Sequence, residues 1–399
     1  MSTSVTSPRT EFERMPIAGK QKISVLYLQL GTTIFAGIER VVDTICAELA
    51  KNHGDDFDVD VLRVSQHENY PAEPRFYRSI MRPVTSRIGL IRTFRRVVQE
   101  KHYDLVVIPQ IEPTVIFWFA RLGIKQKITA HLHGNPHHES SHFKSKIMFF
   151  AMKHLVSRRI ASMFGTSPRQ LKAFARDFNY KGPMFWVPNP VRRFEEPAED
   201  EKPNPDVITF VNVGRFDRQK GQDILIDAFA KLYERRKDVR LSLVGYGSDE
   251  PMLADRIRRL GLSDVAKLVY YPVDPQRALF ESDIYVATSR WEGWCLAICE
   301  ALRCGLPVVS TDCDFGPSDI LVDQRLGRLV PPGDEDALVQ AMQYYCDNLA
   351  EERAFDAYRR ENIDQYSVEK SAKIHADAIR RSVARPSAEE VTLLKPAAS

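Results

Sequence analysis

Runs of apolar residues of strand length alternate with amphipathic stretches of helical length along the first half of the chain. The segments KISVLYLQL, DVDVLRV, DLVVIPQ and KITAHLHG predict strands, and IERVVDTICAELAKNHG predicts a helix that ends at Gly54. Strands that are apolar along their whole length and separated by helices are typical of a parallel sheet covered on both faces. We therefore expect the first half to form a doubly wound α/β lobe.

The same alternation begins again after a segment rich in proline and charge, MFWVPNPVRRFEEPAEDEKPNPD. Beyond this segment, VITFVNVG, VRLSLVG, AKLVYY, IYVATS and LPVVST predict five more strands with helices between them. The fold class is thus α/β, with two Rossmann-like lobes that face each other across a cleft. Ligands of such sheets bind beyond the carboxyl ends of the strands.

These patterns divide the 399 residues into six parts. We expect a disordered N-terminus, a first lobe, a linker, a second lobe, a helix that crosses back to the first lobe, and a loose tail, over residues 1–20, 21–190, 191–206, 207–365, 366–385 and 386–399. The crossing helix is expected to act as a brace when the lobes close.

Composition excludes several classes of protein. At 44% hydrophobic residues the chain is too apolar to be disordered, and a net charge of +3 excludes a strongly cationic nucleic-acid coat, so we expect no nucleic-acid partner. The charge is unevenly distributed. Residues 1–200 hold 29 of the 56 basic and 20 of the 53 acidic side chains, a net charge of +9, and the remaining 27 basic and 33 acidic side chains give the rest of the chain a net charge of −6. The two halves are therefore expected to meet different partners.

No apolar run reaches the length of a membrane-spanning helix, and the polar start MSTSVTSPRTEFER lacks the apolar segment of a secretory signal. We therefore expect a cytoplasmic protein. In that compartment the cysteines are expected to be reduced core residues, since the spacing of the four that fall within twenty residues does not match a paired-CxxC zinc site. Metal ligation and redox chemistry are the alternatives for these six: Cys46, Cys295, Cys299, Cys304, Cys313 and Cys346.

The segment GRFDRQKG brings two cations, Arg215 and Lys220, to the turn between a strand and a helix. A guanidinium binds phosphate oxygens through paired N–H donors, an ammonium adds a compact charge, and a helix N-terminus attracts anions. The pattern therefore indicates a diphosphate site that begins at Gly214. An ordinary basic turn between a strand and a helix is the alternative.

The segment SRWEGWCLAICEALRCG places Glu292 and Glu300 eight residues apart around a helix entry. Eight helical residues return to within about 80° of the starting direction and rise by about 12 Å, so both carboxylates can bind one extended ligand at opposite ends. Carboxylates accept hydrogen bonds from sugar and ribose hydroxyls. The backbone amides at the helix start suit phosphate oxygens, and they belong to Gly293, Trp294, Cys295 and Leu296. The alternative is a pair of solvated surface glutamates, although an unpartnered carboxylate at Glu300 would lie among apolar residues.

At these residues the sequence resembles the retaining glycosyltransferases of family 4, which have the GT-B fold. The resemblance extends over nearly the whole chain and is weakest from Ser65 to Arg96. It implies that the second lobe binds a nucleotide-sugar donor and the first lobe an acceptor. In particular it implies contacts of Arg215 and Lys220 with the donor diphosphate, of Glu292 with the donor sugar, and of Glu300 with the ribose.

Weaker correspondences add residues to this site. FAGIERVV resembles the Gly-Gly loop of the family and implies Gly37 near the sugar, with Ala36 where the first Gly is usual. HLHGNP implies that His133, which directly precedes Gly134, points at the sugar, and a purely structural histidine is the alternative.

Three details concern the nucleotide. LVGYGSD resembles a Gly-x-Gly turn near the nucleotide, which implies Gly245 and Gly247 there and the backbone as far as Val273 against the base. Cys295 stands where a small residue is usual and implies a thiol beside the diphosphate. STDCDFGPSDIL resembles members that use UDP-linked hexoses or N-acetylhexosamines, with Asp319 where Glu is commoner, and favours UDP over GDP donors.

The residues also predict a mechanism. Two cations can stabilise the departing diphosphate without a metal, and no Asp-x-Asp motif lies beside the site, so we expect neither a metal nor another cofactor. The first lobe offers no clear carboxylate nucleophile. Front-face attack with retention of configuration is therefore favoured, with His133 orienting the sugar or relieving charge and no residue assigned as a base.

Two segments of the first half, SRIGLIRTFRRVVQEKH and FKSKIMFFAMKHLVSRRIASM, mix apolar and basic residues at helical spacing. This pattern is typical of helices that lie on anionic lipid, and of solvated basic faces on ordinary lobe helices. With the positive first half it favours a saccharide or lipid-linked saccharide acceptor at the inner face of a membrane, as in the biosynthesis of surface polysaccharide, lipopolysaccharide or glycans.

Two other functions are compatible with the same fold. A nucleotide-sugar epimerase or phosphorylase would use the same cations, and a non-catalytic subunit would only hold the nucleotide sugar. The complete set of Arg215, Lys220, Glu292 and Glu300 disfavours the subunit. A nicotinamide dehydrogenase is disfavoured because no GxGxxG follows the first strand.

Overall fold

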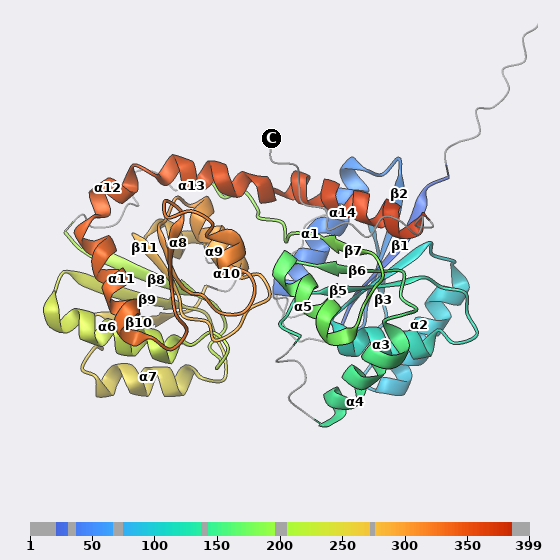
Figure 1. The fold of residues 1–399 in the computed structure, drawn as a ribbon, viewed down its shortest axis with the longest axis horizontal. Helices are drawn as coiled ribbons and strands as arrows, with labels where there is room; N and C mark the ends of the chain where they lie inside the picture. Colours follow the sequence, from blue (N-terminus) through green and yellow to red (C-terminus); the bar gives the residue numbers. More distant parts are fainter. Residues whose placement is uncertain are drawn as a thin grey trace, which may run out of the picture.

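The computed structural model describes residues 21–30, 37–66, 75–136, 143–195, 206–271 and 276–384. Its first lobe contains a seven-stranded sheet, paired in parallel throughout, in the order β3-β2-β1-β4-β5-β6-β7 (Figure 1). The strands are β1 Ile23–Gln29, β2 Phe57–Arg63, β3 Arg78–Met81, β4 Leu105–Pro109, β5 Ile128–Leu132, β6 Ser162–Gly165 and β7 Met184–Trp186. The strands β4 and β5 are buried at every position and β1 at five of its seven, as expected for a sheet between two layers of helices.

The second lobe repeats this design with a six-stranded parallel sheet in the order β10-β9-β8-β11-β12-β13. The strands are β8 Ile208–Val213, β9 Val239–Val244, β10 Ala266–Val269, β11 Ile284–Ala287, β12 Val308–Thr311 and β13 Gly327–Val330. In both lobes the strand order reverses beside the first strand, β1 or β8. Two doubly wound lobes confirm the predicted fold class.

Helices connect the strands and cover both faces of each sheet. Local signals fix several of them: in α5, Ser167 caps the N-terminus by accepting a hydrogen bond from the Gln170 amide, Pro168 opens the first turn, and Asn179 ends the helix in a left-handed conformation. The helices of the first lobe are α1 Gly37–Asn52, α2 Arg87–Glu100, α3 Ile111–Ala120, α4 Phe143–Ala151, continued by the π-turn Met152–Val156, and α5 Pro168–Phe178. Those of the second lobe are α6 Gln222–Arg235, α7 Glu250–Arg259, α8 Gln276–Phe280, α9 Leu296–Arg303, α10 Pro317–Ile320, α11 Glu335–Asp347, α12 Leu349–Arg353 and α13 Asp356–Ile363.

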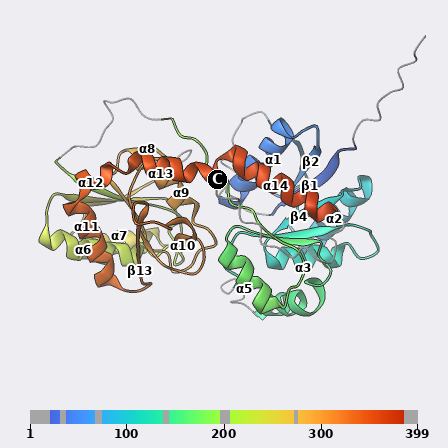
Figure 2. The ribbon, with the colours of Figure 1, turned by 45° about the horizontal axis from the view of Figure 1, so that its top comes forward.

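The chain crosses between the lobes twice, and the two crossings lie side by side. The amide of Val191, on the way out of the first lobe, donates to the carbonyl of Tyr366, on the way back, at 2.8 Å. The returning chain forms α14 (Val368–Val383), which packs along α1 (Figures 1 and 2). An ion pair of 2.6 Å between Arg380 and Asp56 fixes its far end to the first lobe. The predicted crossing helix is thus present.

All nine strands expected from the apolar pattern are found, whereas the short strands β3, β6, β7 and β13 were not predicted. The sequences RSIM, SMFG and GRLV of β3, β6 and β13 mix polar residues or glycine with apolar ones, and MFW of β7 lies in the proline- and charge-rich segment interpreted as a linker. The stretch with the weakest resemblance holds β3 and the start of α2. The predictions for the N-terminus at 1–20 and the tail at 386–399 lie outside the described residues, as does most of the predicted linker.

Candidate functional site

Lys220 and Glu292 form a close ion pair at the carboxyl edge of the second sheet. The Nζ atom lies 2.5 Å from Glu292 Oε1, which also accepts a hydrogen bond from Ser289 Oγ at 2.7 Å. Both side chains are largely buried, with 19% and 5% exposed. Burial alone would lower the pKa of Lys220, but the adjacent Glu292 carboxylate outweighs it and holds that pKa above its usual range. Lys220 therefore stays charged and is held in one position.

Arg215 lies beside this pair but is much more open to solvent, with 56% of its side chain exposed. Its Nη2 atom lies 3.1 Å from Asp217 Oδ2 and donates to Gln219 Oε1 at 3.2 Å. Both partners belong to the same loop. The Arg215 guanidinium therefore lies at the solvent-exposed edge of the site, where a ligand can bind it.

Two loops of the second lobe are bound to each other around the ion pair. Arg290, two residues before Glu292, makes a bidentate contact with Asp223 of α6 at 2.7 and 2.9 Å. Gly221 caps α6 with a positive φ of 66°, and a Cβ there would stand 2.2 Å from the carbonyl oxygen of Thr288. Only glycine allows this approach, so the GRFDRQKG and SRWEG segments are locked together.

Three of the five glycines predicted in the donor site lie against the same strand end. A Cβ on Gly245 would stand 1.9 Å from the carbonyl oxygen of Gly214, and one on Gly247 would stand 2.3 Å from that of Phe216. Gly214 itself packs against the Lys220 side chain, because a Cβ there would stand 3.3 Å from Lys220 Cγ. The Gly-x-Gly turn therefore lies directly beside the segment that carries Arg215 and Lys220.

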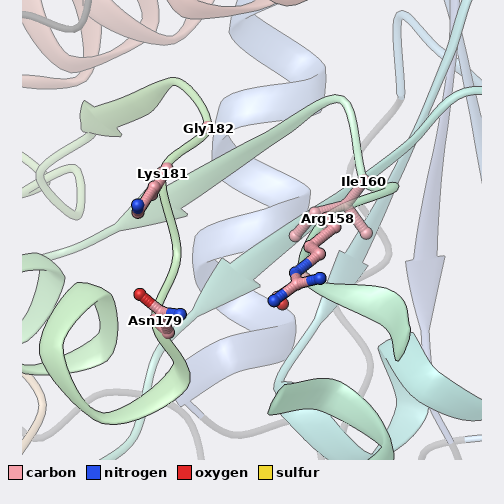
Figure 3. Close-up of a pocket in the computed structure, with 6 residues that line it drawn as sticks. Arg158, Ile160, Asn179, Lys181 and Gly182 are labelled. Atoms are coloured by element: carbon pink, nitrogen blue, oxygen red, sulfur yellow. The ribbon is translucent and has the colours of Figure 1, made fainter. Parts of the chain in front are cut away.

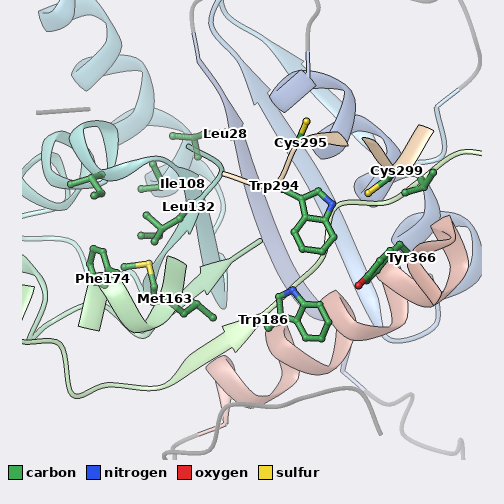
Figure 4. Close-up of a cluster of buried hydrophobic side chains, with 14 of the residues drawn as sticks. Leu28, Ile108, Leu132, Met163, Phe174, Trp186, Trp294, Cys295, Cys299 and Tyr366 are labelled. Atoms are coloured by element: carbon green, nitrogen blue, oxygen red, sulfur yellow. The ribbon is translucent and has the colours of Figure 1, made fainter. Parts of the chain in front are cut away.

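At the start of α9 the side chains of Trp294 and Cys295 are buried in the protein. The indole of Trp294 is 1% exposed and packs against Trp186 and Tyr366, so its side chain has no access to a ligand (Figure 4). Cys295 adopts a left-handed conformation with φ of 64°, and burial raises the pKa of its thiol. Leu296, which begins α9, is half-buried. Any contact of Trp294 with a donor is therefore made by its backbone.

All six cysteines are free and buried, which agrees with the prediction of reduced core residues. Among the described residues, no group of three or more His, Cys, Asp and Glu side chains is arranged to hold a metal ion.

The first lobe contributes the end of β5 to the site. A Cβ on Gly293 would stand 2.0 Å from the carbonyl oxygen of His133, so the backbones of the two lobes touch there. The His133 ring lies 3.9 Å from that of His131, and burial lowers the pKa of His133 to about 3. Its imidazole is therefore neutral, and neither ring nitrogen has a hydrogen-bond partner in the described part of the chain.

Further polar contacts connect the lobes at this point. Ser167, which caps α5, donates to Asp319 of α10 at 2.5 Å, and Asn135 donates to Asp314 at 3.4 Å. The Asp319 carboxylate also accepts from the Gly316 amide at 3.2 Å, so this residue braces the lobes and caps α10. The sequence analysis did not indicate Ser167, which lies in no quoted motif, or Asp314, which lies within STDCDFGPSDIL but was not singled out there.

Glu300 faces the first lobe from α9. It is 6% exposed overall, and its Oε1 lies 3.8 Å from Nη1 of Arg40 in α1. Gly37 begins the same helix, is exposed, and has open space where a Cβ would lie. Ala36 and the rest of the preceding loop, and Val273 with the segment expected against the base, lie outside the described residues.

A separate hollow of about 370 Å³ lies at the opposite edge of the first sheet (Figure 3). It is lined by residues around the amino ends of β6 and β7: Ser157, Arg158, Ile160, Asn179, Lys181 and Gly182. None of the predicted site residues lines it.

Comparison with known proteins identifies the family. Residues 193–362 match the model of the glycosyl transferases group 1, and residues 36–190 match that of the glycosyl transferase 4-like domain. The chain belongs to family 4 of the GT-B glycosyltransferases. This confirms the family that the sequence resembles.

Several curated members of family 4 match part of the chain. A stretch of 170 residues is 26% identical to the N-acetylgalactosamine-N,N'-diacetylbacillosaminyl-diphospho-undecaprenol 4-alpha-N-acetylgalactosaminyltransferase of Campylobacter jejuni, covering 43% of this chain and 45% of that one. A stretch of 165 residues is 30% identical to the lipopolysaccharide 1,6-galactosyltransferase of Escherichia coli, covering 39% and 44%. The matches span less than half the length of these relatives.

Solved structures share the fold over nearly their whole length. Sucrose-phosphate synthase from Thermosynechococcus elongatus has a TM-score of 0.75 at 20% identity and covers 90% of this chain and 99% of its own. Anabaena HepE in complex with UDP has a TM-score of 0.73 at 19% identity and covers 90% and 100%. At identities of 20% and 19%, these similarities show a shared fold and not a shared substrate.

Proposed function

We propose that this protein transfers a hexose or N-acetylhexosamine from a UDP-sugar to a saccharide or lipid-linked saccharide acceptor, with retention of configuration. The observation that carries the proposal is the buried ion pair of Lys220 and Glu292. Arg215 lies beside this pair, and Glu300 lies within α9, the helix that follows Glu292. Together these residues offer cations for a diphosphate and carboxylates for the hydroxyls on either side of it. A role in the biosynthesis of surface polysaccharide, lipopolysaccharide or glycans follows.

The donor would be bound mainly by the second lobe. Lys220 and Arg215 would contact the diphosphate, and the close approach of Gly245 to Gly214 would leave room for the nucleotide beside them. Glu292 would accept hydrogen bonds from the sugar and Glu300 from the ribose. The preference for UDP is supported by HepE, a structural neighbour in complex with UDP.

Departure of the diphosphate builds negative charge on the leaving oxygen. A preorganised Lys220, held charged by Glu292, would stabilise that charge more strongly than water does, which is the main source of catalysis in such sites. With side-chain cations in this role, we propose that no metal and no other cofactor is required. The acceptor hydroxyl would enter on the face from which the diphosphate leaves.

His133 would orient the sugar as a neutral hydrogen-bonding group. With a pKa of about 3 the imidazole carries no charge near neutral pH, so it cannot relieve charge as a cation. One ring N–H remains free for a sugar hydroxyl within the described part of the chain. Of the two roles considered for His133 from the sequence, the geometry favours the orienting one.

The acceptor would be met at an anionic membrane surface. The helix α4 exposes Phe143 (77%), Ile147 (49%) and Phe150 (63%), which follow one another at intervals of four and three residues and so form one stripe. On either side of the stripe stand exposed lysines, Lys144 and Lys146. An apolar stripe between lysines is the arrangement of a helix that lies in the headgroup region of a bilayer.

This stripe begins near the cleft. Glu112, at the start of α3, accepts hydrogen bonds of 3.4 Å from Arg87 at the start of α2 and from Ser145 of α4. The three helix starts therefore lie together at the carboxyl edge of the first sheet, and Ile88, 64% exposed, adds apolar surface there. A bilayer at this edge would bring a lipid-linked acceptor close to His133. No helix in the described ranges is long and apolar enough to cross a bilayer.

A donor screen by calorimetry with UDP-, GDP- and ADP-sugars, followed by mass spectrometry of products on candidate acceptors, tests the proposal. We expect binding of UDP and a UDP-sugar, and a product heavier by one sugar residue. Release of nucleotide with no sugar transferred to any acceptor would favour the epimerase or phosphorylase instead. Nucleotide binding without turnover would favour the non-catalytic subunit.

A further inference from the structure

Arg40 is a cation of the first lobe that faces the donor site of the second. It lies near the start of α1, and its Nη1 atom stands 3.8 Å from Oε1 of Glu300. The Arg40 side chain is 27% exposed and that of Glu300 is 8% exposed. This distance is longer than a hydrogen bond, and within the described ranges it is the one ion pair that Arg40 makes. Most of the five N–H donors of its guanidinium therefore remain for a ligand.

The position of Arg40 in α1 is not explained by the stability of that helix. A positive charge near a helix N-terminus opposes the helix dipole, whereas the preceding Glu39 complements it. Glu39 therefore complements the dipole of α1, and Arg40 opposes it. The helix dipole thus gives no reason for a cation at position 40.

Arg40 and Arg215 face the same space from opposite lobes. The pKa of the Tyr246 hydroxyl, in the Gly-x-Gly turn, is raised by burial first and also by Tyr270 and Glu39, and Arg215 and Arg40 each oppose that rise. Tyr246 lies beside the strand end that carries Arg215. One cation from each lobe therefore acts on this hydroxyl, with the Glu39 carboxylate of α1 acting against them.

The charges at the donor site leave a role for a further cation. Lys220 and Arg215 lie among three carboxylates, Glu292, Glu300 and Asp217, so these five residues together carry a net charge of −1. A nucleotide sugar brings two negative charges on its diphosphate, and the departing nucleoside diphosphate carries about one more, since a terminal phosphate loses its second proton near pH 6. Arg40 brings the net charge of the set to zero, which lessens the repulsion of the diphosphate.

We propose that Arg40 is a donor-binding residue, which pairs with Glu300 in the ligand-free protein and binds the diphosphate once ribose hydroxyls occupy Glu300. This inference rests on the proposed function. Because Arg40 belongs to the first lobe and the diphosphate is held by the second, its binding closes the cleft on the donor. It favours the leaving nucleoside diphosphate over the intact nucleotide sugar, since the former carries the larger charge.

Calorimetry with two probes, UDP and UDP-glucose, tests this on Arg40→Gln. We expect the affinity for UDP to fall about tenfold, the value of one charge-assisted contact, and that for UDP-glucose to fall less. With an active donor, kcat should fall more than KM rises. Arg40→Lys keeps the charge and should recover most of the loss. The matched control is Lys51→Gln, which removes an exposed cation from the other end of α1 and should leave both affinities unchanged.

The outcomes separate the two proposals. If wild-type protein binds UDP but Arg40→Gln weakens UDP and UDP-glucose by the same factor, or weakens neither, Arg40 is an interlobe brace and the inference is wrong. If Arg40→Lys behaves like Arg40→Gln, charge is not the reason, and the inference is equally wrong. If wild-type protein binds no UDP, the UDP-sugar function itself fails, and the role of Arg40 with it.

Discussion

The backbone of Gly293 lies against the carbonyl group of His133, so closely that a Cβ on Gly293 would stand 2.0 Å from the His133 oxygen. Gly293 follows Glu292 directly, and His133 ends a strand of the other lobe. The hydroxyl of Thr166 donates to the Gly293 carbonyl at 3.4 Å from the same side. Lobe contact and the position of the Glu292 carboxylate are therefore coupled through one glycine.

Replacing this glycine should separate the lobes. In Gly293→Ala the new methyl group meets backbone rather than a movable side chain, so we expect the loop or the lobe to shift and turnover to fall about 100-fold, the cost of a misplacement near 1 Å. Steady-state kinetics measure the loss, and a calorimetric scan should show a folded protein. Wild-type turnover in Gly293→Ala would show that the contact does not position Glu292.

Removing either member of the buried ion pair should abolish most activity. Lys220→Ala and Glu292→Ala are each expected to lower turnover by about 100-fold or more, because each loses a contact with the transition state. Lys231→Ala is the control, since it removes an exposed lysine of α6 that pairs with Glu335. If both site variants kept near-normal rates while folded, the assignment of the donor site would be wrong.

Chelation should leave the reaction unaffected. If Lys220, Arg215 and the backbone amides supply the charge that stabilises the diphosphate, turnover in excess EDTA should equal that in Mg²⁺. Initial rates before and after chelation measure this. A strict requirement for a divalent cation would contradict the mechanism while leaving the donor assignment in place.

The exposed stripe on α4 should bind anionic lipid. We expect the protein to float with phosphatidylglycerol liposomes at low salt and Ile147→Ser with Phe150→Ser to weaken binding at least about tenfold, because each replacement removes several apolar groups worth ~0.8 kcal/mol per buried CH₂. Met252→Ser is the control, as Met252 is 40% exposed on α7 of the second lobe. Equal flotation of the α4 and α7 variants, or none by wild type, would remove the membrane from the proposal.

Acid should destabilise the protein through three buried histidines. Burial lowers the pKa of His133 and of His375 to about 3, and burial also lowers the pKa of His131 well below its usual value. The three rings lie together between β5 and α14. The unfolded chain binds protons from about pH 6.5 downward, while the folded chain does not, so stability must fall as pH drops below that value.

This loss of stability can be measured by urea unfolding at pH 7.5 and 5.5. Below about pH 6 each histidine contributes a slope of ~1.4 kcal/mol per pH unit. We expect His375→Phe to reduce the difference in unfolding free energy between pH 7.5 and pH 5.5 by the contribution of one histidine. The control is His102→Gln, on the surface, which should leave that difference unchanged. A His375→Phe protein with the full wild-type difference would show that the pKa of His375 is the same in the folded and unfolded chains, which would contradict the lowered value.

Much of this protein follows from sequence. Period and length of the apolar runs determine the two doubly wound lobes, because a strand buried on both faces must be apolar throughout. The segment GRFDRQKG brings Arg215 and Lys220 together since both lie in one short turn, and this contact needs no knowledge of the rest of the chain. The continuous helix assumed for the spacing of Glu292 and Glu300 is wrong, because α9 begins only at Leu296, after Cys295 in a left-handed conformation, and Glu292 lies in the loop before it.

The tertiary structure decided what lies across the gap between the lobes. Arg40 meets Glu300 across 260 positions of sequence, His133 meets Gly293, and Ser167 meets Asp319, yet no local pattern marks any of these pairs. The tertiary structure also buries the Trp294 side chain in the core, where it packs on Tyr366 of the chain that returns to the first lobe. Such contacts depend on how two separately folded sheets dock, and docking depends on surface shape and charge that come from many distant segments at once.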